Sequence, residues 1–365
     1  MNKVTNDVLK KIIKHADDYG FFKIIENNGI CESFMFGPAG QLLSENIRKE
    51  WIYSNVTHRE NNVFTFKSMG NHPNLLTDIR EPFKIAKNYL NSECPFGLVD
   101  IGNYSVASDS LDSNGIYPQK HQLMRYFAIL PPKESEQFFY RYQQQRKRWW
   151  RKFSLDPGRF KFEEVEKCND NIGLIAKIGA EFSWGFHCLE TVHYHGGLPF
   201  QNVSLDDVNI FSVRAGKKRC LPHIVECKIN LDYAAFSYLC DAFTTKKNKI
   251  ILKFHRKMAP FKFSFACDDA SAEESKTLHE IAELMCLELR KAGLQCLLPA
   301  SSDFTKKLYI QLLRSDSLGI PYTAIVTKET LNNGIFGLYS RDTTLQEQVH
   351  MGKMAEYGEL LMKNY

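Results

Sequence analysis

The chain has 365 residues, of which 44% are hydrophobic and 24% charged, and it carries 47 Lys and Arg against 42 Asp and Glu. These are globular values, so a disordered or fibrous chain is excluded and two or three domains are expected. No apolar run approaches the roughly 18–20 residues of a membrane-spanning helix, so an integral membrane protein is not expected. Ten cysteines without a CxxC pair, and no recognisable signal peptide, indicate reduced thiols in a nuclear, cytosolic or mitochondrial setting.

The first 257 residues mix helical and strand patterns. Residues 1–20 predict an amphipathic helix with Val4, Val8, Ile12 and Ile13 on one face. This segment has four lysines, three aspartates and no arginine, whereas transit peptides are rich in arginine and poor in acids, so it is not expected to be one. The patterns that follow predict helices at 37–54, 80–91, 134–153 and 232–243, and strands at 123–130 and 220–229.

The last hundred residues are the most regular part of the chain. Their patterns predict strands at 261–267, 294–298, 322–327 and 336–340, helices at 271–293, 303–315 and from 344 onward, and a turn at Asn332-Asn333-Gly334. Such alternation predicts a mixed sheet flanked by helices. Because Met258-Ala259-Pro260 precedes this pattern, we predict two domains, residues 1–257 and 258–365.

Three stretches contain basic residues and no acid. They are 141–152 (RYQQQRKRWWRK), 214–219 (RAGKKR) and 246–257 (KKNKIILKFHRK), and together they hold 16 of the 47 basic residues in 30 positions. The alternative for each run is a solvated face without a partner. Three such runs favour a polyanionic partner, because focused positive charge on phosphates releases counterions.

The net charge of +5 divides unevenly along the chain. Residues 1–257 carry 36 basic and 28 acidic residues, a net of +8, and residues 258–365 carry 11 and 14, a net of −3. A basic larger part could meet a nucleic acid, while the slightly acidic C-terminal part is freer to dock a protein.

Two parts of the sequence resemble class IIa aminoacyl-tRNA synthetases, of the glycyl type in particular. The string LGIPYTAIVTKETLNNGIFGLYSRDTTLQEQV (318–349) resembles their anticodon-binding domain, and APFK (259–262) resembles the entry to that domain. The segment GPAGQLLSENIRKEW (37–51) resembles their motif 1 helix. The resemblance implies an α+β core domain with an antiparallel sheet, followed by a C-terminal α/β anticodon-binding-like domain with a mixed sheet.

The positions at which those enzymes hold ATP differ in this chain. Where their motif 2 has arginine and glutamate, this sequence has Val106 and Ser108. Where their motif 3 has glycine and arginine, after the string PHIVE (222–226), it has Asn230 and Tyr233. Adenylate formation spreads charge over phosphate oxygens that the two arginines stabilise. We therefore do not expect an active synthetase.

One family with this skeleton has lost the catalytic motifs: the accessory subunits of mitochondrial DNA polymerase gamma. The sequence resembles them in RKRWWRKFSLDP (146–157), FSWGFHCLETV (182–192), LDYAAFSYLCDAF (231–243), LHEIAEL (278–284) and LNNGIFGLYSRDTT (331–344). The resemblance implies a non-enzymatic subunit without a cofactor, which binds the polymerase catalytic subunit, helps it hold primer-template DNA and raises its processivity. It also implies a location in the nucleoid of the mitochondrial matrix. From the division of charge, we expect the C-terminal domain to be the interface with the catalytic subunit.

The basic runs supply the residues expected to contact nucleic acid in such a protein. The candidates are Arg146, Lys147, Arg148, Arg151, Lys217, Lys218, Arg219, Lys246, Lys247, Lys249, Arg256 and Lys257. Trp149 and Trp150 could stack on bases, but neighbours on a helix point about 100° apart, so at most one is expected to do so.

The family resemblance also bears on the oligomeric state. Vertebrate members carry a long helical insertion between the motif 1 and motif 2 regions, and that insertion builds a homodimer. Here only residues 61–95 lie between the corresponding landmarks, which is too short for such a bundle. We therefore expect a 1:1 complex with the catalytic subunit rather than a homodimer.

A histidine-rich segment raises the question of a metal site. His187, Cys188, His193 and His195 lie within nine residues, but their spacing matches no standard zinc pattern, so no metal is expected. Glu190 is the nearest counterpart of a substrate-binding acid of the glycyl enzymes, and without the ATP arginines we expect it to make a structural pair or cap.

Two other classes of function stay open at this level. One is a divergent glycyl-type synthetase or a tRNA-binding relative, and the other is a scaffold protein whose basic runs only keep it in solution. Two further expectations are local: Arg341 forms an ion pair with Asp342, and Cys220, Cys227 and Cys240 are small core residues.

Overall fold

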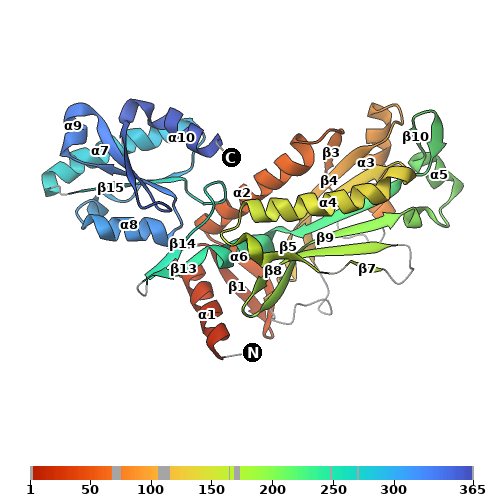
Figure 1. The fold of residues 1–365 in the computed structure, drawn as a ribbon, viewed down its shortest axis with the longest axis horizontal. Coiled ribbons are helices and arrows are strands. Elements are labelled where there is room, and N and C mark those ends of the chain that lie inside the picture. The colour runs from red at the N-terminus through yellow and green to blue at the C-terminus, as the bar shows by residue number, and fades with distance from the viewer. Residues whose placement is uncertain are drawn as a thin grey trace.

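The computed structural model describes residues 3–67, 75–105, 116–163, 165–167, 173–246, 249–268 and 271–363. They form two lobes that lie side by side along the long axis of the molecule (Figure 1). The larger lobe runs from the N-terminus to the end of strand β14, and the smaller lobe begins at strand β15. Within the described part of the chain, no helix combines the length and the apolar character that crossing a membrane requires.

The larger lobe contains an eight-stranded sheet with helices on both faces. Its helices are α1 (Lys3–Asp18), α2 (Pro38–Ile52), α3 (Leu75–Tyr89), α4 (Pro132–Lys152), α5 (Leu205–Phe211) and α6 (Leu231–Ala242). Its strands are β1 (Phe22–Asn27), β2 (Ile30–Phe36), β3 (Val63–Phe66), β4 (Phe96–Ser105), β5 (Lys120–Leu130), β6 (Phe160–Phe162), β7 (Glu166–Lys167), β8 (Leu174–Phe182), β9 (Gly185–Gly196), β10 (Val213–Ala215), β11 (Lys218–Cys220), β12 (His223–Asn230), β13 (Phe243–Lys246) and β14 (Lys249–Leu252).

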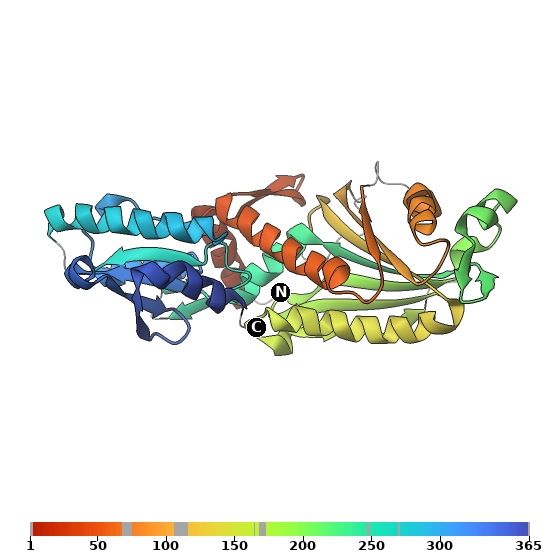
Figure 2. The same cartoon turned by 90° about the horizontal axis from the view of Figure 1, so that it is seen from above.

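The large sheet has the order β3-β4-β5-β12-β9-β8-β6, with β7 also paired to β8. All of its pairs are antiparallel except β3 with β4, which are parallel. Successive side chains of a strand point to opposite faces, and β5 is buried on both. Phe127 and Ile129 pack in the cluster under α3, whereas Tyr126 and Ala128 pack in the cluster under α4. Figure 2 shows α4 extended along its face of the sheet.

The smaller lobe is a five-stranded mixed sheet with its own core. Its strands are β15 (Phe263–Cys267), β16 (Cys296–Leu297), β17 (Tyr322–Val326), β18 (Ile335–Ser340) and β19 (Gln346–His350), and its helices are α7 (Ala272–Lys291), α8 (Leu308–Ser317), α9 (Lys328–Asn333) and α10 (Met354–Lys363). The sheet order is β16-β15-β17-β18-β19, with β15 parallel to β16 and β17 and the remaining pairs antiparallel. The fold class expected from the sequence is confirmed in both lobes.

Two local predictions in the smaller lobe are wrong. The chain from 344 onward does not start a helix: it forms β19 first, and α10 begins at Met354. Thr344 has a positive φ of 58° and Ser340 N–H donates to Leu345 O, so a tight turn folds this segment back on β18. The Asn332-Asn333-Gly334 turn is the end of the short helix α9, and Gly334 caps it in the left-handed conformation (φ 70°).

Hydrogen bonds from buried polar side chains connect the two lobes. The Arg341 guanidinium pairs with Asp342 at 2.8 Å, as expected, but it also donates to three backbone carbonyls, Leu252 O, Gly319 O and Phe254 O, at 2.7–2.9 Å. A ring nitrogen of His15, in α1, also lies 2.8 Å from Ser317 O, at the end of α8. The lobes are therefore joined by specific hydrogen bonds as well as by the connecting chain.

Candidate nucleic-acid interface

The three basic runs occupy different regions of the molecule. The first forms the C-terminal half of α4, the second forms the β10–β11 hairpin, and the third forms the β13–β14 hairpin with the chain that follows it. In Figure 1 the β10–β11 hairpin lies at the far end of the larger lobe, whereas β13 and β14 lie beside the smaller lobe. The runs therefore do not make one continuous surface.

Arg146 was expected on the nucleic-acid surface, and this prediction is wrong. Its side chain is 1% exposed, because it lies on the face of α4 that packs against the sheet. Its Nε donates to Glu190 Oε1 at 2.5 Å, and Trp150 Nε1 donates to the other carboxylate oxygen at 2.5 Å. The Cys227 thiol, also buried, donates to Glu190 at 2.8 Å. A guanidinium enclosed in this way cannot reach a phosphate.

The tryptophan pair belongs to the core as well. Trp150 is fully buried and stacks with Phe160 and Tyr238, and Trp149 is 7% exposed and donates through Nε1 to Glu50 O at 3.3 Å. Neither indole can stack on a base. The position of both indoles in the core follows from the packing of α4 against the sheet rather than from nucleic-acid binding.

The other basic residues of the first run differ in their exposure and in their contacts. Arg148 is exposed, Lys147 is half-buried with its ammonium 4.7 Å from the centroid of the Phe162 ring, and Arg151 Nε donates to Phe160 O at 3.0 Å. Lys152, at the C-terminal end of α4, is exposed. Only part of this run is therefore available to a partner.

The structure brings cations of the first and third runs together at the junction of the lobes. Burial, and then the charges of Arg256, Lys257, Lys152 and Lys262, lower the pKa of His255 to about 4. Lys49 from α2 joins the same group, since it and Lys257 both contribute to the lowered pKa of the buried Lys262, after burial itself. We call Lys49, Lys152, Arg256 and Lys257 the junction cluster.

The junction cluster gathers positive charge from separate segments of the chain. Lys257 Nζ pairs with Glu50 at 3.5 Å. Cations focused at one place are the property that a phosphate backbone requires. The sequence places these four residues up to 208 positions apart, so no run in the sequence could show the cluster.

The tip of the β13–β14 hairpin is a second basic feature close to the smaller lobe. Lys246 and Lys249 face each other in the register and are exposed, and Lys249 Nζ lies 5.3 Å from the centroid of the Tyr309 ring on α8. Lys247 lies outside the described residues. This tip and the junction cluster are both next to the joint between the lobes.

The second run forms what we call the distal hairpin. Lys217, Lys218 and Arg219 are exposed there, and burial, then the charge of Arg219, lower the pKa of Lys87. Arg214 at its base is bound internally, donating to Asn91 O at 2.8 Å and pairing with Glu93 at 3.6 Å. The distal hairpin is basic, and in Figure 1 it lies at the end of the larger lobe that is farthest from the smaller lobe.

At the positions of the synthetase motifs, the residues that the structure describes have structural roles. Val106 and Ser108 lie outside the described residues. The Asn230 side chain caps α6 by accepting from Tyr233 N–H at 2.9 Å, and the Tyr233 hydroxyl, fully buried, hydrogen bonds to His187 Nδ1. Neither side chain can hold a phosphate.

A pocket of about 620 Å³ opens next to the start of α6, and sequence reasoning missed it. It is lined by aromatic and polar groups that include Phe34, Phe36, Lys120 and Asp232. Burial raises the pKa of Asp232 to about 7. Among the described residues that line the pocket, Lys120 is the single lysine or arginine, and its ammonium pairs with Glu32 at 2.6 Å. The Phe-x-Phe alternation of β2 was the one signal in the sequence.

The histidine-rich segment does not gather into a ligand set. His195 Nε2 lies 2.9 Å from Glu226 Oε2, and its ring stacks on that of His193, while His187 is directed at Tyr233 in the core. In the described part of the chain, no three His, Cys, Asp or Glu side chains are placed to hold a metal ion. Glu190 makes the buried structural pair described above.

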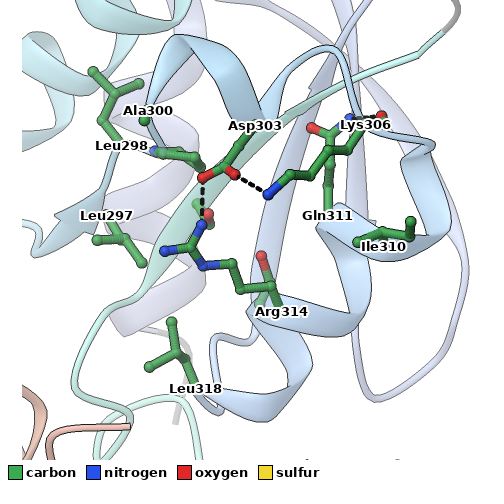
Figure 3. A pocket seen from close by; sticks show the side chains of 12 residues that line it. Leu297, Leu298, Ala300, Asp303, Lys306, Ile310, Gln311, Arg314 and Leu318 are labelled. Carbon is green, nitrogen blue, oxygen red and sulfur yellow. Dashed lines mark hydrogen bonds and ion pairs between the residues drawn. The ribbon is translucent and has the colours of Figure 1, made fainter.

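The smaller lobe contains an apolar cavity of about 130 Å³ between the end of β16 and α8. Figure 3 shows leucine side chains on one side and Arg314 with Asp303 on the other. Asp303 is paired with both Arg314 and Lys306, and both amide atoms of Gln311 are used by backbone groups. Since its polar groups are already paired, this cavity suits an apolar side chain better than a nucleotide.

Comparison with known proteins agrees with this geometry. Residues 269–359 match the family model for the anticodon binding domain. DNA polymerase subunit gamma-2 of Mus musculus is 25% identical, over 88% of this chain and 82% of the mouse protein. The mitochondrial subunit gamma-2 of Drosophila melanogaster is 28% identical, over 65% of this chain and 66% of the fly protein.

The matched length differs among the relatives. The alignment with the Xenopus laevis protein, also called DNA polymerase subunit gamma-2, is 26% identical and spans 73% of this chain but only 59% of the frog protein. Glycine–tRNA ligase of Borrelia garinii is 24% identical over 76% of this chain and 64% of the ligase. Both resemblances expected from the sequence, to polymerase gamma accessory subunits and to glycyl-type synthetases, are confirmed.

Proposed function

We propose that this relative of the gamma-2 subunits is a non-catalytic accessory subunit of the mitochondrial DNA polymerase. It binds the catalytic subunit through its smaller lobe, with the division between the parts at residues 257 and 258, and helps to hold primer-template DNA in the matrix nucleoid. The observation that carries the proposal is the similarity of most of the chain to proteins named as DNA polymerase subunit gamma-2. The junction cluster, with cations from three separate segments, supports the contact with DNA.

The mechanism is electrostatic and geometric. In Figure 1, β13 and β14 lie beside the smaller lobe, so a catalytic subunit docked on that lobe would be close to the tip of their hairpin. Arg256 and Lys257 of the junction cluster lie in the chain between β14 and β15, which connects the two lobes. Cations there add phosphate contacts to those of the polymerase, and each added contact slows the dissociation of the complex from DNA. No bond is made or broken by the accessory chain itself.

The proposal predicts a 1:1 complex. Mixed with the mitochondrial polymerase catalytic subunit, the chain is expected to sediment as a complex of one copy of each, and to lengthen the DNA made per binding event on a primed single-stranded template. The chain alone is expected to sediment as a 42.2 kDa monomer, because residues 61–95 are too short for a dimerising bundle. A stable dimer at low micromolar concentration would contradict the stoichiometry, and the lack of any complex would contradict the function.

The alternative of an active or tRNA-binding glycyl-type enzyme has its own test. The chain is expected to show no ATP–pyrophosphate exchange with glycine above a no-enzyme control. Asn230 and Tyr233 are engaged in the core, and the one described Lys or Arg of the adjoining pocket is already paired. Measurable exchange that scales with protein concentration would favour the synthetase instead.

A further inference from the structure

Strand β19 forms one edge of the five-stranded sheet. It pairs with β18 on one side, and among the described residues no strand pairs with its other side. Four of its five residues are exposed, and Val349 is the partly buried one. Edge strands with free backbone groups are templates for an added strand unless something covers them.

The register identifies which backbone groups of β19 are free. Ser340 N–H donates to Leu345 O at one end of the β18–β19 pair, and Met351 N–H donates to Gly334 O at the other. Hydrogen-bonded and non-hydrogen-bonded pairs alternate in an antiparallel ladder. Glu347 and Val349 therefore direct their N–H and C=O groups at β18, whereas Gln346 and Gln348 direct theirs outward.

A groove accompanies this free edge. It has a volume of about 320 Å³ and is formed by β19 together with α10, with Val349, Tyr357 and Leu360 as its apolar part. Leu360 is 46% exposed, so its side chain has room to cover a neighbour. An added strand would place every second side chain in this groove, which supplies the specificity that backbone pairing lacks.

The charges around the groove favour one kind of binding segment over another. Glu347 and Glu356 are exposed beside it, against Lys353. Tyr357 donates to Glu347 at 2.5 Å, and this hydrogen bond, with burial and the carboxylate charge, raises the pKa of the phenol to about 12. The residues from 258 onward carry a net charge of −3. A segment with a basic side chain facing the groove fits better than an acidic one.

We infer that an extended, basic segment of the polymerase catalytic subunit pairs with the free edge of β19 as a sixth strand. This inference rests on the proposed function and specifies the part of the smaller lobe that carries the contact. Its backbone partners are Gln346 and Gln348, and its side chains enter the groove between β19 and α10.

The test is a proline that removes one outward donor. Gln348→Pro deletes an N–H that β18 does not use, and proline is tolerated on edge strands, so the fold is expected to survive. Gln348→Ala removes the same side chain and keeps the N–H. With the full-length chain and the catalytic subunit, Gln348→Pro is expected to weaken the complex by about tenfold or more, while Gln348→Ala stays near the original affinity.

Hydrogen exchange of the unaltered complex gives a second readout. The amides of Gln346 and Gln348 are expected to exchange fast in the free chain and to become protected on binding. Equal affinities for the two variants without this protection would overturn the inference and leave the proposed function intact. If the unaltered chain forms no complex with the catalytic subunit, the result contradicts the proposed function itself, and with it the inference that rests on it. Protection in the free chain that depends on its concentration would instead identify a second copy as the occupant, and would also overturn the inference.

Discussion

Replacing Arg146 with alanine is expected to lower the free energy of unfolding by about 3–5 kcal/mol, the largest effect of any single change considered for this chain. The guanidinium is 1% exposed and its partner Glu190 is 0% exposed, so the substitution leaves a carboxylate in the core without a counter-charge. Trp150 and Cys227 would still donate to that carboxylate, but neither is positively charged. Chemical denaturation followed by tryptophan fluorescence measures the change.

The matched control lies two residues away on the same helix. Arg148 is exposed, and Arg148→Ala is expected to change stability by no more than about 0.5 kcal/mol. Replacing both members of the pair, as in Arg146→Met with Glu190→Leu, is expected to recover part of the loss, since no charge is then buried alone. Equal stability losses for the Arg146 and Arg148 variants would contradict the buried-pair explanation.

Neutralising the junction cluster is expected to have the largest effect on DNA binding. The triple variant Lys152→Ala, Arg256→Ala, Lys257→Ala should weaken binding of the polymerase complex to primer-template by about tenfold or more near 0.1 M salt. Each phosphate contact that is lost should also flatten the slope of log K against log salt by about 0.9. Fluorescence anisotropy with a labelled primer-template, over a salt series, measures both quantities.

Two variants of equal charge change make this test specific. Lys217→Ala, Lys218→Ala, Arg219→Ala also removes three charges, but from the distal hairpin, and is expected to leave the salt slope unchanged. Lys246→Ala, Lys247→Ala, Lys249→Ala removes three charges from the third basic run, whose Lys246 and Lys249 lie at the hairpin tip, and is expected to flatten the slope. If the distal variant reduced the slope as much as the junction variant, total charge rather than position would explain the binding.

The predictions from the sequence were best where a periodic pattern coincided with a buried face. Helix α4, expected at 134–153, spans Pro132–Lys152, and strand β5, expected at 123–130, spans Lys120–Leu130. The error at residue 344 has a different origin. The turn at Thr344 folds the chain back, and the backbone of 346–350 then pairs with β18 as a strand before α10 begins.

The candidate nucleic-acid interface shows which properties follow from the sequence and which depend on the tertiary structure. The sequence alone determined that the charge is divided and that the skeleton is of the synthetase type. Only the tertiary structure decided which cations are available. It buried Arg146 against Glu190 and assembled Lys49, Lys152, Arg256 and Lys257 at the junction of the lobes. The physical reason is that residue type fixes a side chain's charge, whereas exposure and neighbours depend on how distant segments pack.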